Sequence, residues 1–238
     1  MATISIPGSQ NVDLTVYGRG TVIAGSGNDS IDITGKGKII VGSGWDTLTL
    51  KSGGVIEEFG KSGHDTIHLG SGHYTWDIDV QGKATVTGSF GTATISGGSL
   101  VVDPTAQLST LTAEGGSMTL IGSSGTEFIG GSGSTKMVGG KGNESFVGGS
   151  GHDTMVAGTG HDIFEFLKSN AGGSDLIQNF VSGHDQLYLE GESLSWLKSH
   201  HDISTAHGNT YISLDGGKTT IELQGVTSLS SSNVTTHK

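Results

Sequence analysis

Large apolar residues recur at every ninth position in the middle of the chain. Written from Ile121, the sequence divides into the blocks IGSSGTEFI, GGSGSTKMV, GGKGNESFV, GGSGHDTMV and AGTGHDIFE. The eighth position of successive blocks is held by Phe128, Met137, Phe146, Met155 and Phe164. A helical stripe needs spacings of three and four residues, so a constant spacing of nine excludes one. The pattern predicts strands of about three residues, separated by turns, whose middle side chains share one core.

The alternation of Phe and Met at this core position predicts two facing sheets, one built from odd blocks and one from even blocks. Two blocks would then make one full coil, and the strands of successive coils would stack on one another. The expected fold class is all-β, a parallel β-roll or β-solenoid that ends in a β-rich C-terminal cap. In this cap we expect a short helix over 193–201 and a hairpin over 209–226, followed by about a dozen loose polar residues.

Acidic residues gather at the sixth position of the blocks, directly after the glycine-rich turn. This position is held by Thr126, Thr135, Glu144, Asp153 and Asp162, so its acidic character grows toward the C-terminal side. The glycines before it are expected to supply the positive φ angles of the turn, since glycine adopts them without steric cost.

More degenerate copies of the unit precede these blocks. The segments GRGTVIAGSGNDSIDI (18–33), GKGKIIVGSGWDTLTL (35–50) and GKSGHDTIHL (60–69) place Asp29, Asp46 and Asp65 at spacings close to two blocks. These three aspartates should therefore stack along one edge of the solenoid. The intervening turns contain Arg19 and Lys36 in place of acids, which would confine ion binding in this half to a single edge.

Three regions follow from these patterns. Residues 1–120 are expected to form a divergent β-solenoid, with degenerate metal-binding turns at 24–76 and metal-free coils over 77–120. The nonapeptide roll covers 121–165, and the cap covers 166–238. Asp175 and Asp185 lie in two further turns at the start of the cap, in GGSD and SGHD.

Composition narrows the classes of partner. Acids outnumber basic residues 23 to 12, which gives a formal net charge of −11. Nucleic-acid binding needs a basic surface, so no nucleic-acid partner is expected. The chain has no cysteine, which excludes disulfides and thiolate metal sites. Its first residues, MATISIPGSQ, lack the pattern of a cleaved signal peptide, and no apolar run is long enough for a transmembrane segment.

The acidic turns indicate a calcium site. Stacked strands lie about 4.8 Å apart, and calcium takes six to eight oxygens at roughly 2.3–2.6 Å, so an ion between two stacked turns reaches both. Without an ion, two carboxylates about 5 Å apart repel each other by roughly 3 kcal/mol at an effective dielectric constant near 20. Since a whole domain is stable by only about 5–15 kcal/mol, calcium binding should drive folding.

Blocks such as GGSGHDTMV and AGTGHDIFE resemble the nonapeptide G-G-x-G-x-D-x-(apolar)-x of the RTX (repeats-in-toxin) proteins. The segment SDLIQNFVSGHDQLYL is similar to the one that follows the repeats in serralysin-type proteases. The resemblance implies a calcium-loaded parallel β-roll and export by a type I secretion machinery that reads a signal in 166–238. Extracellular or cell-surface localisation would follow. The chain departs from the family at Thr126 and Thr135, which replace the acid, and it lacks the protease zinc motif H-E-x-x-H.

We therefore predict that Ca²⁺ is bound by eight acids: Asp29, Asp46, Asp65, Glu144, Asp153, Asp162, Asp175 and Asp185. The leading hypothesis is a non-enzymatic structural component of a surface layer, biofilm matrix or adhesive filament, with self-association into filaments or sheets. The alternative is a carbohydrate-active or hydrolytic enzyme that uses the solenoid face at 77–120. A glycan-binding or ice-binding module is a third hypothesis.

Overall fold

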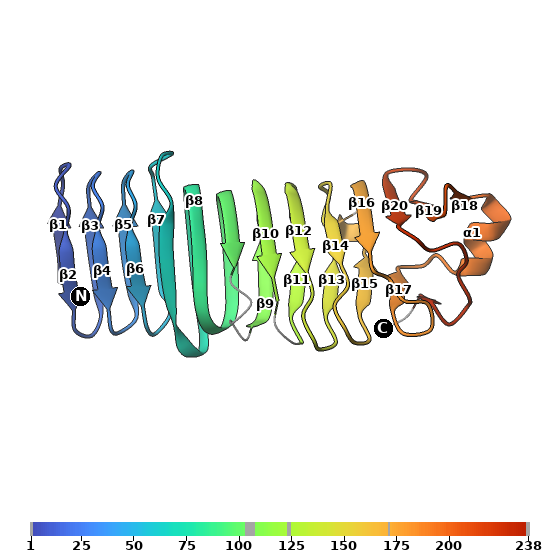
Figure 1. Cartoon of the computed structure of the whole chain (residues 1–238), viewed down its shortest axis with the longest axis horizontal. Helices are drawn as coiled ribbons and strands as arrows, with labels where there is room; N and C mark the ends of the chain where they lie inside the picture. Colours follow the sequence, from blue (N-terminus) through green and yellow to red (C-terminus); the bar gives the residue numbers. More distant parts are fainter. Residues whose placement is uncertain (1, 103–107, 123–124, 171, 237–238) are drawn as a thin grey trace.

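The computed structural model describes residues 2–102, 108–122, 125–170 and 172–236. The chain forms an elongated solenoid, with coils that follow one another from the N-terminal end to a cap at the C-terminal end (Figure 1). Nearly all strand pairs are parallel, and the described part of the fold contains one α-helix. The predicted fold class is confirmed.

Two rows of parallel strands build the N-terminal coils. One row pairs β1 (Ala2–Ile6), β3 (Gly20–Ala24), β5 (Gly37–Val41) and β7 (Gly54–Glu58). The other row pairs β2 (Asp13–Val16), β4 (Ser30–Ile33) and β6 (Thr47–Leu50). Ile31 is in register with Leu48, so one coil here is slightly shorter than two nonapeptide blocks. Both rows continue into β8 (Asp65–Val102), which pairs with β6 and with β7.

Both rows of strands continue beyond β8, which also pairs with β9 (Leu108–Ala113) and β10 (Ser117–Ile121). One row contains β9, β11 (Glu127–Ile129), β13 (Ser145–Val147), β15 (Ile163–Phe166), β17 (Gln186–Leu189) and β21 (Val234–Thr235). The other row contains β10, β12 (Ser134–Val138), β14 (Thr154–Val156), β16 (Gly173–Gln178) and β20 (Thr219–Leu223). Phe146 is in register with Phe164, so one coil here consists of two nonapeptide blocks.

The core residues divide between the two rows as the alternation predicts. Phe128, Phe146 and Phe164 are fully buried in β11, β13 and β15. Their rings stack at centroid separations of 5.0 and 4.8 Å. Met137 and Met155 are fully buried and in register on β12 and β14. The period of nine therefore reflects two strands per coil.

Of the repeat glycines, Gly125 in the first block has the predicted positive φ, at 66°, whereas those of the later blocks are needed for another reason. Over residues 129–164, none of the glycines has a φ in the left-handed region. A Cβ on Gly151 would instead lie 1.8 Å from the carbonyl oxygen of Gly133, one coil earlier. The turns stack so closely that no side-chain carbon fits between them, and this close approach is what requires glycine there.

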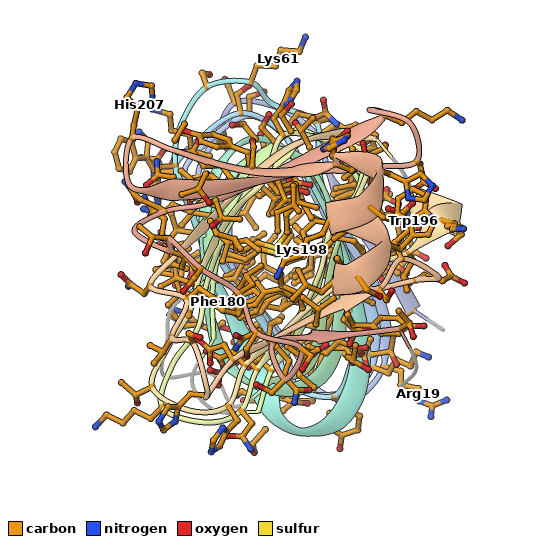
Figure 2. The ribbon with its side chains drawn as sticks, turned by 90° about the vertical axis from the view of Figure 1, so that its right-hand side faces the viewer. Arg19, Lys61, Phe180, Trp196, Lys198 and His207 are labelled. Carbon is orange, nitrogen blue, oxygen red and sulfur yellow. The ribbon has the colours of Figure 1, made fainter. Side chains whose placement is uncertain are left out.

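A cap covers the C-terminal end. Helix α1 (Leu194–His200) begins after Ser193, whose side chain accepts a hydrogen bond from the backbone N–H of Trp196. The hairpin of β18 (Ile203–Ala206) and β19 (Asn209–Leu214) adds to β20 with antiparallel pairing. Figure 2 shows α1 and these strands lying across the end of the solenoid.

Helix α1 confirms the predicted helix over 193–201, and the antiparallel pair of β19 and β20 confirms the predicted hairpin over 209–226, whereas the prediction of a loose C-terminal tail is wrong. Strand β21 pairs with β17, and Asn233 is fully buried. Its side chain accepts a hydrogen bond from the Ser182 hydroxyl at 2.9 Å, which ties the tail to the last coil. Composition alone made this segment look unstructured.

Candidate metal centre

The eight predicted acids form three ladders. In each ladder, a carboxylate oxygen accepts a hydrogen bond from a backbone N–H of the turn one coil earlier. The Asp46 ladder runs through Asp29, Asp46 and Asp65: Val12 N–H donates to Asp29, Asp29 N–H to Asp46 and Asp46 N–H to Asp65, at 2.9, 2.8 and 3.0 Å. The structure thus brings these three aspartates together along one edge, as their spacing predicts.

The nonapeptide repeats carry a ladder on each of their edges. In the Asp153 ladder, Asp153 accepts a hydrogen bond from Thr135 N–H at 2.8 Å, and Asp175 accepts one from Asp153 N–H at 2.9 Å. The Asp162 ladder contains Glu144, Asp162 and Asp185, which bond the N–H groups of Gly125, Glu144 and Asp162 at 3.0, 2.8 and 3.0 Å. Glu144 therefore stacks with Asp162, whereas Asp153 lies in the turns of the other edge.

All eight acids are buried, at 3% relative exposure or less. A buried carboxylate needs hydrogen bonds or a countercharge, because it has lost the solvation that stabilises its charge in water. Within the described residues, four of the eight have one oxygen without a hydrogen-bond partner: Asp29, Asp46, Glu144 and Asp175. A bound cation would give these four oxygens the partner that they lack.

Burial makes these carboxylates costly to ionise in the absence of a cation. Desolvation raises the pKa of Asp46 to about 7, and the charges of Asp65 and Asp29 add to the shift. Desolvation also raises the pKa of Asp65 to about 6 and that of Asp175 to about 7. The same cause raises the pKa values of Asp29, Glu144, Asp153 and Asp185. A divalent cation would reverse this penalty by stabilising the ionised form.

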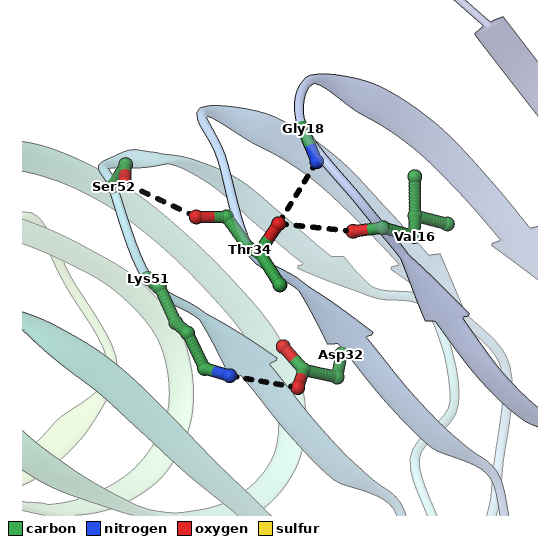
Figure 3. A network of polar contacts seen from close by, with 6 residues as sticks. All are labelled: Val16, Gly18, Asp32, Thr34, Lys51 and Ser52. Atoms are coloured by element: carbon green, nitrogen blue, oxygen red, sulfur yellow. Dashed lines mark hydrogen bonds and ion pairs between the residues drawn. The ribbon is translucent and has the colours of Figure 1, made fainter.

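The second edge of the N-terminal coils is built differently. We call the turns 17–19, 34–36 and 51–53 the neutral edge. There the Thr34 hydroxyl accepts a hydrogen bond from Gly18 N–H at 2.8 Å, and the Ser52 hydroxyl donates to the Thr34 carbonyl at 3.3 Å (Figure 3). The only charged contact drawn nearby is the ion pair of Lys51 with Asp32 on the strand face, at 2.9 Å. This edge is held by neutral hydrogen bonds, although its turns contain the basic residues Arg19, Lys36 and Lys51.

Side chains alone do not complete a metal site. Over the described parts of the chain, no three His, Cys, Asp or Glu side chains converge into a group that could hold a metal ion. A cation at these edges must take further oxygens from backbone carbonyls or water, both of which calcium accepts. The close stacking of the glycine turns brings carbonyls of one coil against the next, as Gly133 lies against Gly151, two residues before Asp153. Bound calcium would supply positive charge, while the ladder acids and turn carbonyls would hold it.

Of the buried acids among the described residues, the sequence analysis missed three: Glu58, Glu165 and Glu192. Glu58 ends β7 and is 3% exposed. Desolvation raises its pKa, and the charge of Glu58 in turn contributes to the raised pKa values of Asp46 and Asp65. An alignment of 20–24, 37–41 and 54–58 could have revealed it, because it places Glu58 where the other strands end in Ala24 and Val41.

Comparison with known proteins identifies the repeats. Residues 129–164 match the family model described as RTX calcium-binding nonapeptide repeat (4 copies). This match confirms the resemblance seen in the sequence, and it makes calcium the cation that these repeats bind. No curated protein matches the chain.

A solved structure that resembles the chain is the extracellular lipase LipA from Serratia marcescens, with 14% sequence identity and a TM-score of 0.28. The match covers 91% of this chain and 39% of the lipase, so the chain spans well under half of that protein. A TM-score this low gives no support for transferring fold or activity from the lipase.

Two features bear on the remaining expectations. In the part of the chain that the structure describes, no helix has the length and apolar character needed to cross a membrane. The face over 77–120, on which the alternative enzyme would be built, includes residues 103–107, which lie outside the described residues. That alternative stays a prediction.

Proposed function

We propose that this chain, whose residues 129–164 carry RTX calcium-binding nonapeptide repeats, is a secreted, non-enzymatic protein that folds when its acidic edges bind extracellular calcium. The observation that carries the proposal is the stacking of eight buried acids into three ladders. Such ladders repel themselves when ionised and unneutralised. Calcium is scarce in the cytoplasm and plentiful outside, so the fold would form after export.

A type I secretion machinery is the proposed route of export, and 166–238 is the proposed location of its signal. This route transports unfolded chains, which suits a chain that reaches its fold only where calcium is abundant. The proposed final location is the extracellular space or the cell surface.

The proposed role is structural, in a surface layer, a biofilm matrix or an adhesive filament. The elongated shape and the repetitive surface of the solenoid support this role (Figure 1). The two ends of the molecule differ. Strands β1 and β2 pair only with β3 and β4 among the described strands, whereas α1 and β18 lie over the other end. Unpaired strand edges favour association with further chains, so self-association would begin at β1 and β2.

Circular dichroism tests the folding part of the proposal. The purified chain should lose much of its β signal and unfold at a lower temperature in excess EGTA, and calcium should restore both, with magnesium as the control ion. Electron microscopy and light scattering of the calcium-loaded protein test the structural part. Filaments, sheets or dimers would support it, and monomers at all calcium concentrations would contradict it.

A further inference from the structure

Glu58 places a charge in a column of apolar side chains. Val41 is in register with Glu58, and Glu58 is in register with Val80 on β8. Ala24, one coil before Val41, completes the column, and these three apolar residues are all buried. Glu58 is as buried as they are, at 3% exposure. A carboxylate in such a column is unfavourable unless something nearby neutralises it.

The turn after Glu58 is longer than the turn stacked below it. Val41 is in register with Glu58, and the acids that follow them, Asp46 and Asp65, are stacked in the same ladder. Turn 59–64 therefore occupies the place that turn 42–45 occupies one coil earlier, and it contains two more residues. The extra backbone lies between the buried glutamate and Asp65, the last acid of the Asp46 ladder.

No side chain in the described part of the chain forms an ion pair with Glu58. The lysines that form ion pairs there are Lys38, bound to Glu57, and Lys51, bound to Asp32. Lys61 belongs to turn 59–64 itself, yet it points away from the molecule (Figure 2). Glu58 is held by backbone hydrogen bonds instead, including one from Gly82 N–H at 2.8 Å.

A carbonyl of turn 59–64 lies near the carboxylate of Glu58. A Cβ on Gly82 would lie 3.2 and 3.4 Å from the two carboxylate oxygens of Glu58 and 3.4 Å from the carbonyl oxygen of Gly60. On the ladder side, Asp46 senses the charge of Glu58, and its oxygen Oδ2 is buried without a hydrogen-bond partner among the described residues. Carboxylate and carbonyl oxygens are the donors that hard divalent cations prefer.

We propose that Glu58 holds a calcium ion at turn 59–64, together with main-chain carbonyls of that turn and the last two acids of the Asp46 ladder, Asp46 and Asp65. Glu58 lies outside the nonapeptide pattern, so this site differs in kind from those of the repeats. The inference rests on the proposed calcium binding along the ladders, and it adds a ligand at the point where the Asp46 ladder meets β8. The cation would neutralise the one charge in an otherwise apolar column.

The test compares three variants of the full chain. Glu58→Val restores the apolar column, Glu58→Gln keeps the hydrogen bond from Gly82 but removes the charge, and Glu57→Gln removes the neighbouring, more exposed carboxylate as a control. Isothermal titration calorimetry would count bound calcium, and thermal unfolding would be followed in calcium and in EGTA.

We expect both Glu58 variants to bind one calcium fewer than the wild type, whereas Glu57→Gln binds the full number. Glu58→Val should also unfold at a higher temperature than the wild type in EGTA and gain less from calcium. An unchanged calcium count and equal stabilisation by calcium in all four proteins would overturn the inference. A wild type that binds no calcium at all would instead overturn the proposed function. If Glu58→Val fails to fold, the calcium count of Glu58→Gln decides alone.

Discussion

The N-terminal coils and the nonapeptide repeats share one continuous core but close their edges differently. In the N-terminal coils, one edge carries the Asp46 ladder and the other is the neutral edge, held by Thr34 and Ser52. In the repeats, both edges carry acids, in the Asp153 and Asp162 ladders. The same solenoid can thus be closed by neutral hydrogen bonds or by ladders of buried acids. Under the proposed function, calcium dependence would therefore belong to individual edges of the solenoid and not to the solenoid as a whole.

The ladders also differ in how each acid uses its second oxygen. In the repeats, Oδ2 of Asp153 and Asp162 accepts a hydrogen bond from the N–H of Gly149 and Gly158 in its own turn, at 3.3 and 2.9 Å. Among the described residues, two of the three acids of the Asp46 ladder, Asp29 and Asp46, have no such partner for Oδ2, whereas in the two repeat ladders the second oxygen lacks one in two of five acids, Glu144 and Asp175. Acids on the N-terminal edge are therefore less often satisfied by the protein itself.

The largest effect is expected from removing a charge in the repeats. Asp162→Asn keeps an acceptor oxygen for Glu144 N–H but cannot neutralise a cation. Loss of one member of a buried charged pair costs about 3–5 kcal/mol, so we expect a loss of about 3 kcal/mol in saturating calcium. Urea denaturation measures it. Asp32→Asn, on the strand face, is the matched control, and equal stabilities of the two variants would contradict the role of Asp162.

The next effect is independent of calcium. Gly151→Ala introduces a Cβ 1.8 Å from the carbonyl oxygen of Gly133 and must push two stacked turns apart. Overpacking of this kind typically costs about 1–3 kcal/mol. We expect the urea midpoint to fall, and Ser150→Ala in the same turn should leave it nearly unchanged. A Gly151→Ala protein as stable as the wild type would mean that the turns are not stacked this closely.

The nine-residue repeat determines which parts of the fold and of the candidate site could be predicted from the sequence. The repeat predicts a core shared by two rows of strands, because Phe146 and Met155 lie half a coil apart. It also predicts that Asp29 and Asp46, which are nearly two blocks apart, stack in one ladder. It does not by itself mark Glu58, because this acid stands at the end of a strand, at a position where Ala24 and Val41 are apolar, and not at the acidic position of a turn. The buried Asn233 was missed for another reason: besides the nearby Ser230, its side chain bonds Ser182 and Asp185, which lie far away in the sequence.

A pH effect is expected in the calcium-free protein. The folded-state pKa values of Asp46 and Asp175 are raised to about 7, above the unfolded value near 3.8. A raised carboxyl pKa contributes stability at low pH that is lost as pH rises through about 7. In EGTA, the protein should therefore be more stable at pH 5 than at pH 8, by about 2 kcal/mol for each group.

With calcium the trend should reverse, because protonated carboxylates no longer bind the ion. Thermal unfolding at several pH values, with and without calcium, measures both trends. Asp46→Asn should reduce the pH dependence in EGTA, and Asp32→Asn should not. Parallel pH profiles in calcium and EGTA would contradict the assignment of these aspartates as buried and cation-dependent.

The smallest effect is expected on the N-terminal strand face beside the neutral edge. Lys51 and Asp32 form an exposed ion pair, and such pairs contribute roughly 0–1 kcal/mol. Lys51→Met should change the free energy of unfolding by less than about 1 kcal/mol, equally with and without calcium. A loss as large as that of Asp162→Asn would mean that charge, and not neutral hydrogen bonding, stabilises this side of the N-terminal coils.

Hydrogen exchange measured by mass spectrometry, with calcium and with excess EGTA, tests the central claim that cations neutralise the acidic edges. The account predicts that the N–H groups that donate to ladder carboxylates, such as those of Asp29, Glu144 and Asp153, lose their protection when calcium is removed. The N–H of Gly18, which donates to Thr34 on the neutral edge, should lose the least. Full protection of all three ladders in EGTA would contradict the account.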